Sequence, residues 1–134
     1  GDEQRELHAA AALANIAELV EGNTQNRMID EGVIKPLMRL ADSPNAGIRR
    51  EVARCFSLFA SKRDSHATLV RVHAAVRMMT FLRDTDEIAQ RYGVLGIGNL
   101  AVSRESHQEL FDVGAVAQLV DCAKASDIMT KRAV

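Results

Sequence analysis

The stretch Gly93–Ser103 reads GVLGIGNLAVS and decides the fold. Its apolar residues Val94, Ile97, Leu100 and Ala101 are spaced by three, three and one, so they share one face of a helix. Each glycine inside a helix costs roughly 1 kcal/mol relative to alanine, and this stretch contains several. We therefore expect close-packed neighbours to hold this helix in place.

An internal repeat is the next feature, because the phrase AAAALANIAE at positions 9–18 resembles the first stretch. Gly32, His73 and Gly114 are evenly spaced, with about 41 residues from each to the next. Apolar residues agree at the same spacing in three columns: Ile29, Val70 and Phe111; Ile34, Ala75 and Val116; Leu37, Met78 and Leu119. A period of this length predicts a solenoid of stacked repeats.

Each repeat is expected to hold a short helix, a second helix and a longer third helix. Gly32 and Gly114 break the chain after the short helix, because glycine accepts the left-handed conformation that ends helices. His73 in the same position implies a strained or altered turn. The predicted single domain spans 1–134, with a lone third helix at 1–21, repeats at 22–62 and 63–103, and a repeat at 104–134 truncated within its third helix after a turn at 126–127.

The third helices supply the predicted core. Their aligned apolar columns are Ala9, Val52 and Gly93; Ala10, Ala53 and Val94; Leu13, Phe56 and Ile97; Ile16, Phe59 and Leu100. Small residues in the first two columns let neighbouring third helices approach closely. No capping repeat with a polar outer face is evident, so we expect a piece of a longer solenoid whose exposed end faces favour end-to-end association.

Composition excludes several function classes. The 134 residues are 47% hydrophobic with two prolines and 4% aromatics, which favours an all-helical chain. A net charge of −1 gives no general attraction to nucleic acid. No apolar run approaches the roughly 20 residues that a membrane span needs. We expect neither nucleic acid nor direct membrane insertion.

Catalytic and metal-binding patterns are also missing from the sequence. The four histidines are scattered, and the glycines of GIGNL lie in a helical pattern rather than between a strand and a helix. Cys55 and Cys122 belong to different helices in apolar contexts, which predicts buried thiols in a reducing compartment rather than a disulfide or a metal site. We expect no enzymatic activity, no cofactor and no metal.

The order of short helix, glycine, second helix, capped turn and a long third helix ending in A-L-x-N-I/L-A resembles the armadillo repeat. The motifs that carry the resemblance are NRMIDEGVIKPLMRLADSP at 26–44, ALANIA at 12–17, GIGNLA at 96–101 and ELFDVGAVAQLV at 109–120. The resemblance implies an all-α, right-handed superhelix of three-helix repeats. HEAT repeats are the nearest alternative, but they are two-helix units without the glycine-broken first helix.

In armadillo proteins the third helices line a concave groove that holds extended peptides. The groove asparagine of the family matches Asn15 and Asn99, while Leu58 replaces it in the middle repeat. An asparagine there can donate and accept backbone hydrogen bonds. Nuclear-import adaptors carry tryptophan one turn earlier, where this tryptophan-free chain has Ala11, Arg54 and Leu95.

Arginines recur two turns before the asparagine column, at Arg50, Arg91 and Arg132, which are one repeat apart, and Arg54 follows one turn along. One interpretation is a ladder of guanidinium groups that binds acidic or phosphorylated segments. The alternative is that each arginine pairs with a nearby carboxylate on a solvated surface.

The predicted function is a protein–protein interaction scaffold or adaptor that binds extended or helical partner segments, acidic ones by preference. The candidate groove residues are Asn15, Arg50, Arg54, Arg91, Leu95, Asn99 and Arg132. The sequence is similar to catenin-like and vacuolar-membrane armadillo adaptors. The alternatives are a nuclear-transport cargo adaptor, which the missing tryptophans oppose, and an architectural role in a cytoskeletal or ciliary assembly. The expected location is the cytoplasm, with the nucleus or cytoskeleton as alternatives.

Overall fold

Helices make up the regular structure of the computed structural model, which describes the backbone of residues 2–133 and the side chains of residues 2–125. In chain order they are α1 (Asp2–Leu19), α2 (Gly22–Asp30), α3 (Ile34–Leu40), α4 (Ala46–Ser61), the 3₁₀ turn η1 (Arg63–Ser65), α5 (His66–Arg71), α6 (Ala74–Leu82), α7 (Glu87–Leu100), the 3₁₀ turn η2 (Arg104–Ser106), α8 (His107–Asp112) and α9 (Ala115–Ala133).

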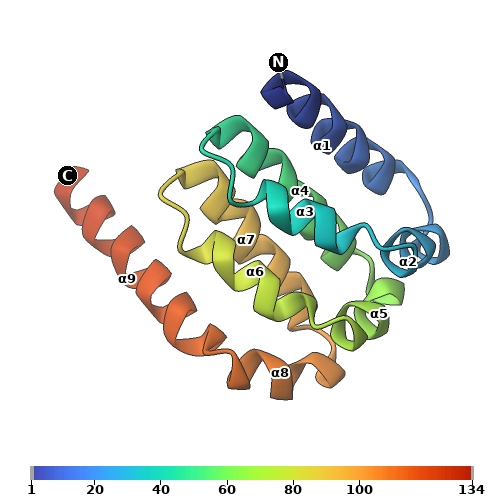
Figure 1. The fold of residues 1–134 in the computed structure, drawn as a ribbon. Helices are drawn as coiled ribbons and strands as arrows, with labels where there is room; N and C mark the ends of the chain where they lie inside the picture. The colour runs from blue at the N-terminus through green and yellow to red at the C-terminus, as the bar shows by residue number, and fades with distance from the viewer. Residues whose placement is uncertain (1, 134) are drawn as a thin grey trace.

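The helices stack in layers (Figure 1). The third helices α1, α4 and α7 lie side by side, and α4 packs against both of the others. The second helices α3 and α6 form a layer over them, with α6 packed on α7. The short helices α2, α5 and α8 follow one another along one edge. Each unit therefore buries its apolar surface against its neighbours, as in a solenoid.

Three residues at the predicted spacing turn the chain between the short helix and the second helix. Gly32 and Gly114 have φ angles of 96° and 80°, and His73 has φ 58° and ψ 41°. The turn at His73 is therefore strained rather than altered, because the histidine takes the left-handed conformation of the two glycines. A left-handed L-residue costs roughly 1–2 kcal/mol. The His73 side chain is exposed, with Nδ1 3.8 Å from a carboxylate oxygen of Glu109.

Aromatic residues fill the centre of the core. Phe56 and Phe59 of α4 are fully buried, and the Phe56 ring lies 5.5 Å from that of Phe81 and 6.2 Å from that of Phe59, measured between centroids. The predicted core columns hold in α4 and α7, with Val94 half-buried against the core. They are wrong for Ala9 and Ile16 of α1, which are exposed because α1 packs mainly on α4 and keeps its opposite side open.

A polar side chain repeats at each junction between units. Gln25, His66 and His107 occupy equivalent positions, and each donates from its terminal nitrogen to a carbonyl at the end of the preceding third helix, at 2.6–2.7 Å. Gln25 accepts from the Ser65 hydroxyl at 2.9 Å, and Nδ1 of His66 pairs with the Ser103 hydroxyl at 2.5 Å. These contacts satisfy helix-end carbonyls that would otherwise be buried without partners.

The last unit differs from the predicted one. We expected a turn at positions 126–127 followed by the start of a third helix, but α9 continues without a break from Ala115 to Ala133. Serine and aspartate are only mildly unfavourable inside a helix, and this segment has neither the proline nor the glycine that would end one. The residues around them are mostly good helix formers.

Two glycines of α7 lie where it meets its neighbours. A Cβ at Gly93 would stand 2.7 Å from Cβ of Phe81 and 3.2 Å from the Leu82 nitrogen, and one at Gly96 would stand 3.3 Å from Cα of Ser57. A Cβ at Gly98 would meet nothing within 4 Å. We expected the glycines of GIGNL to allow close packing against neighbouring helices. This expectation is confirmed at Gly96 and is wrong at Gly98, because no other part of the chain lies near Gly98.

Phe56→Ala and Phe59→Ala should each lower the free energy of unfolding by about 3–5 kcal/mol, because each removes a buried ring and leaves a cavity. Chemical denaturation checks this. A loss under about 1 kcal/mol for either variant would contradict the core described above, since surface substitutions usually stay within about 0.5 kcal/mol.

Gly93→Ala and Gly98→Ala should move stability in opposite directions. The first should destabilise by about 1–3 kcal/mol through overpacking against α6. The second should stabilise by up to about 1 kcal/mol, because alanine favours the helix and nothing obstructs its methyl group. Thermal unfolding of both variants is the measurement, and equal effects would disprove the difference in packing.

Candidate functional site

The predicted groove residues lie on the side of the third-helix layer that α3 and α6 leave uncovered. We call this surface the third-helix face and define it by Asn15 of α1, Arg50 and Arg54 of α4, and Arg91, Leu95 and Asn99 of α7. The helices carry these side chains away from the core because the buried positions of α4 and α7 point in the opposite direction. The side chain of Arg132 lies outside the described residues.

Arg54 joins α4 to α1 across this face. Its Nη2 donates to Oδ1 of Asn15 at 3.0 Å and to Oε2 of Glu18 at 3.1 Å, and its Nη1 donates to Oε2 of Glu51 at 3.1 Å. The Asn15 side-chain oxygen, which we expected to bind a partner's backbone, is thus engaged within the chain.

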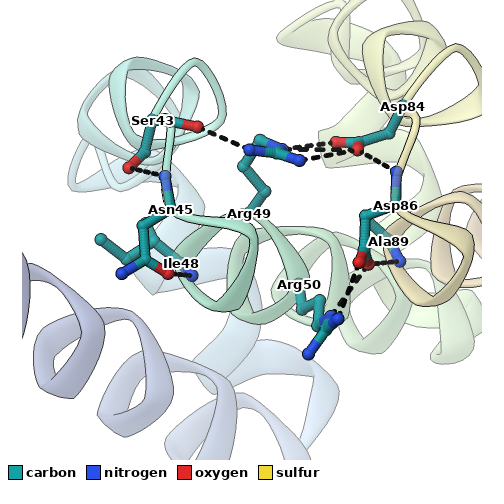
Figure 2. A network of polar contacts seen from close by, with 8 residues as sticks. All are labelled: Ser43, Asn45, Ile48, Arg49, Arg50, Asp84, Asp86 and Ala89. Carbon is teal, nitrogen blue, oxygen red and sulfur yellow. Dashed lines mark hydrogen bonds and ion pairs between the residues drawn. The ribbon is translucent and has the colours of Figure 1, made fainter.

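Arg50 joins α4 to the start of α7 (Figure 2). Its Nε and Nη2 donate to the two carboxylate oxygens of Asp86 at 2.9 and 2.7 Å. Asp86 also caps α7, because its Oδ2 accepts from the Ala89 backbone nitrogen at 3.0 Å. The hydrogen bond from Arg50, and to a smaller extent the one from the Ala89 backbone, lower the pKa of Asp86 to about 2. The contact with Asp86 also raises the pKa of Arg50.

A second arginine strengthens the same junction. Arg49 binds the Asp84 carboxylate at 3.0 Å and the Ser43 carbonyl at 2.9 Å, so it ties together the loops that precede α4 and α7 (Figure 2). Asp84 in turn accepts from the Asp86 backbone nitrogen at 2.8 Å. Both acidic residues of this loop are therefore held by paired arginines of α4.

Arg91 makes the weakest of these contacts. Its Nη2 pairs with Oε1 of Glu87 at 2.7 Å, one turn earlier on the same helix, and both side chains are mostly exposed. Exposed pairs of this kind contribute only about 0.3–0.5 kcal/mol. Every arginine of the ladder with a described side chain therefore pairs with a carboxylate of the chain itself, which agrees with the alternative interpretation given above. The pair of Arg91 costs the least to break, so Arg91 is the arginine most available to a ligand.

Sequence reasoning missed an apolar stripe along α7 and the turn that follows it. Ile88 and Leu95 are seven residues apart, about two helical turns, which places them on one side of α7. Val102 follows seven residues later, in the turn after the helix, and the exposed fractions of the three are 43%, 52% and 61%. The seven-residue spacing of these apolar residues is visible in the sequence and could have revealed the stripe. The half-buried Asn99 adjoins this stripe, and its side chain has no hydrogen-bond partner among the described residues.

Other kinds of site find little support in the part of the chain that the structure describes. No cluster of three potential metal ligands occurs among those residues, and none of their helices is long and apolar enough to cross a membrane. Both cysteines are free thiols. Cys55 is buried as predicted, and burial raises the pKa of its thiol to about 12, whereas Cys122 is only half-buried.

Comparison with known proteins agrees with this architecture. Residues 26–61, which hold most of α2 together with α3 and α4, match the family model of the armadillo/beta-catenin-like repeat. The match covers one repeat, about a quarter of the chain. The fold of the chain is the armadillo solenoid that the resemblance implied, as the two solved structures below show. A comparison with curated proteins gave no match.

Two solved structures superpose on this chain. An engineered protein from the Northeast Structural Genomics Consortium has a TM-score of 0.77 and 23% identity, covering 88% of this chain and 49% of its own. A designed armadillo repeat protein in complex with the peptide (KR)4 has a TM-score of 0.75 and 26% identity, covering 86% and 48%. The chain thus spans about half the length of each of these structures.

The stability of the chain should fall as the pH drops from about 4 to about 2. Asp86 has a pKa of about 2 in the folded chain against an ordinary value of 3.8, so its contribution is present above pH 3.8 and is lost as the folded carboxylate becomes protonated. Asp86→Asn keeps a good capping residue, as Asn45 shows for α4, but removes the charge.

Urea unfolding over this pH range should therefore show a smaller acid-induced loss for Asp86→Asn than for the unchanged chain. Identical acid profiles for the two proteins would contradict the role given to the Arg50–Asp86 pair.

Proposed function

We propose that this chain is a protein-interaction scaffold whose third-helix face binds an extended segment of a partner protein. The observation that carries the proposal is the apolar stripe of Ile88, Leu95 and Val102, which is exposed along α7 and the turn after it, beside the amide of Asn99. Exposed apolar surface with a polar rim marks interaction sites. The designed armadillo protein in complex with the peptide (KR)4 supports a peptide as the class of ligand.

The chemistry of the face suggests what the segment contains. Leu95 and its neighbours on the stripe suit an apolar side chain, and the Asn99 amide can both donate to and accept from a peptide backbone. Arg91 suits a carboxylate, because its exposed pair with Glu87 exchanges at little cost. The acidic preference expected from the sequence thus centres on Arg91.

Arg50 and Arg54 contribute less to an acidic preference than their spacing suggests. A carboxylate that binds Arg50 has to displace Asp86 from a two-point contact, and one that binds Arg54 has to displace Glu18 or Glu51. We therefore infer a ligand with alternating apolar and acidic residues rather than a uniformly acidic one.

Leu95→Asp should reduce the affinity for such a ligand at least tenfold, since an anchoring apolar side chain contributes more than about 1.4 kcal/mol when buried. The measurement is fluorescence anisotropy with a labelled peptide of alternating leucine and glutamate, compared with one of leucine and lysine and with (KR)4.

Val76→Asp is the matched control, because Val76 of α6 is equally exposed (50%) but lies off the third-helix face. It should leave the affinity unchanged. Equal loss in both variants, or no binding of any of the three peptides, would overturn the proposed function. Tighter binding of (KR)4 than of the acidic peptide would overturn the role of Arg91.

A further inference from the structure

A shallow hollow lies between α4 and the turn that leads from α6 to α7. Its volume is about 420 Å³, and it is lined by Arg49, Thr80, Arg83, Asp84 and Thr85. The side chains of Thr80, Arg83 and Thr85 are exposed and have no hydrogen-bond or ion-pair partner among the described residues. Two guanidinium groups and two hydroxyl groups therefore line this surface, which we call the arginine hollow, and all of them can donate hydrogen bonds.

Arg49 is held in a fixed orientation by the residues around it (Figure 2). Its Nε and Nη2 donate to the Asp84 carboxylate and its Nη1 donates to the Ser43 carbonyl, which leaves two of its five N–H groups without a partner among the described residues. The exposed fraction is 17% for the Arg49 side chain and 6% for that of Asp84, so an incoming ligand meets the guanidinium rather than the carboxylate. A guanidinium that is already oriented loses little conformational entropy on binding.

The outer surface of α3 and α6, next to the arginine hollow, is positively charged. These two helices contain three exposed cations, Lys35, Arg39 and Arg77, and no aspartate or glutamate. None of the three forms an ion pair in the described part of the chain, whereas the described arginines of the third-helix face all do. The exposed Asp42, in the turn after α3, offsets only one of these charges. An anion is therefore attracted to this side of the molecule.

The junction between α1 and α4, one repeat earlier, lacks the two arginines of the hollow. Glu6 and Asp42 stand at the positions of Arg49 and Arg83. The helix α1 nevertheless packs closely on α4. Contact between neighbouring third helices therefore does not require the two arginines, and stacking alone does not account for them.

We propose that the arginine hollow binds the phosphate of a phosphoserine or phosphothreonine in a partner protein. Such a phosphate has a charge of about −1.5 to −2 at neutral pH and three acceptor oxygens, which suit two guanidinium groups and two hydroxyl groups. The lining holds no aromatic or aliphatic side chain that would favour a nucleobase or a lipid chain. Acidic residues beside the phosphorylated one suit Arg39 and Arg77. The arginine hollow is separate from the third-helix face, so this proposal does not depend on the peptide binding proposed above.

Fluorescence anisotropy with two labelled peptides tests the proposal. One is a glutamate-rich peptide with a central phosphothreonine, and the other is the same peptide with threonine. The phosphorylated peptide should bind at least tenfold more tightly, and inorganic phosphate should compete with it. Arg83→Gln should weaken its binding about tenfold, because the substitution removes a charge-assisted contact from an exposed position. Leu95→Asp should leave its binding unchanged, which separates this site from the third-helix face.

Arg104→Gln is the matched control, since it removes the same charge from an exposed residue of η2, which follows α7, whereas the arginine hollow precedes α7. It should bind the phosphorylated peptide normally, and circular dichroism checks that each variant is folded. Equal affinity for the two peptides, or equal losses in Arg83→Gln and Arg104→Gln, would overturn the proposal. So would binding to phosphatidylcholine vesicles containing a phosphoinositide that Arg83→Gln weakens, in the absence of binding to the phosphorylated peptide.

Discussion

The close contact of α4 with the third helices on both of its sides is the constraint on which the rest of the structure depends. α4 carries Phe56 and Phe59 into the core and lies between α1 and α7, so no single unit completes a hydrophobic interior. Such contacts between neighbours are the main source of stability in a solenoid. Gly96 matters for this reason, because it lets α7 come within van der Waals distance of the α4 backbone at Ser57.

Polar groups fix the register of that contact from both ends of the third helices. At the beginning, Arg49 and Arg50 bind the two aspartates of the loop before α7. At the end, His66 closes the last turn of α4 through the Ala60 carbonyl and reaches Ser103 in the next unit. Because Asp86 both caps α7 and pairs with Arg50, the start of that helix and its position relative to α4 are set by one carboxylate.

Much of the fold could be predicted from the sequence because stacked repeats carry equivalent residues at a regular spacing along the chain. The even spacing of the turn positions, at Gly32, His73 and Gly114, sets the order of the helices, and the left-handed backbone at each confirms the alignment. Exposure could not be read from this periodicity. Ile16 and Phe59 occupy equivalent positions, yet Ile16 is exposed, since burial depends on whether a neighbouring helix is present and not on the residue alone.

The arginine ladder shows why periodicity is a poor guide to ligand binding in a repeat protein. A side chain that recurs once in every repeat meets the same kind of neighbour each time, because that neighbour recurs with the same period. In this chain Asp2, Asn45 and Asp86 form such a recurring series. The pairing of Arg50 with Asp86 follows from contact between successive units, so the regular spacing reflects stacking and needs no ligand. The apolar stripe of Ile88, Leu95 and Val102 is different, because the equivalent positions in the preceding repeat are Gly47, Arg54 and Ser61. A feature that one repeat carries and its neighbour lacks has no explanation in the stacking, and it is there that binding specificity is best sought.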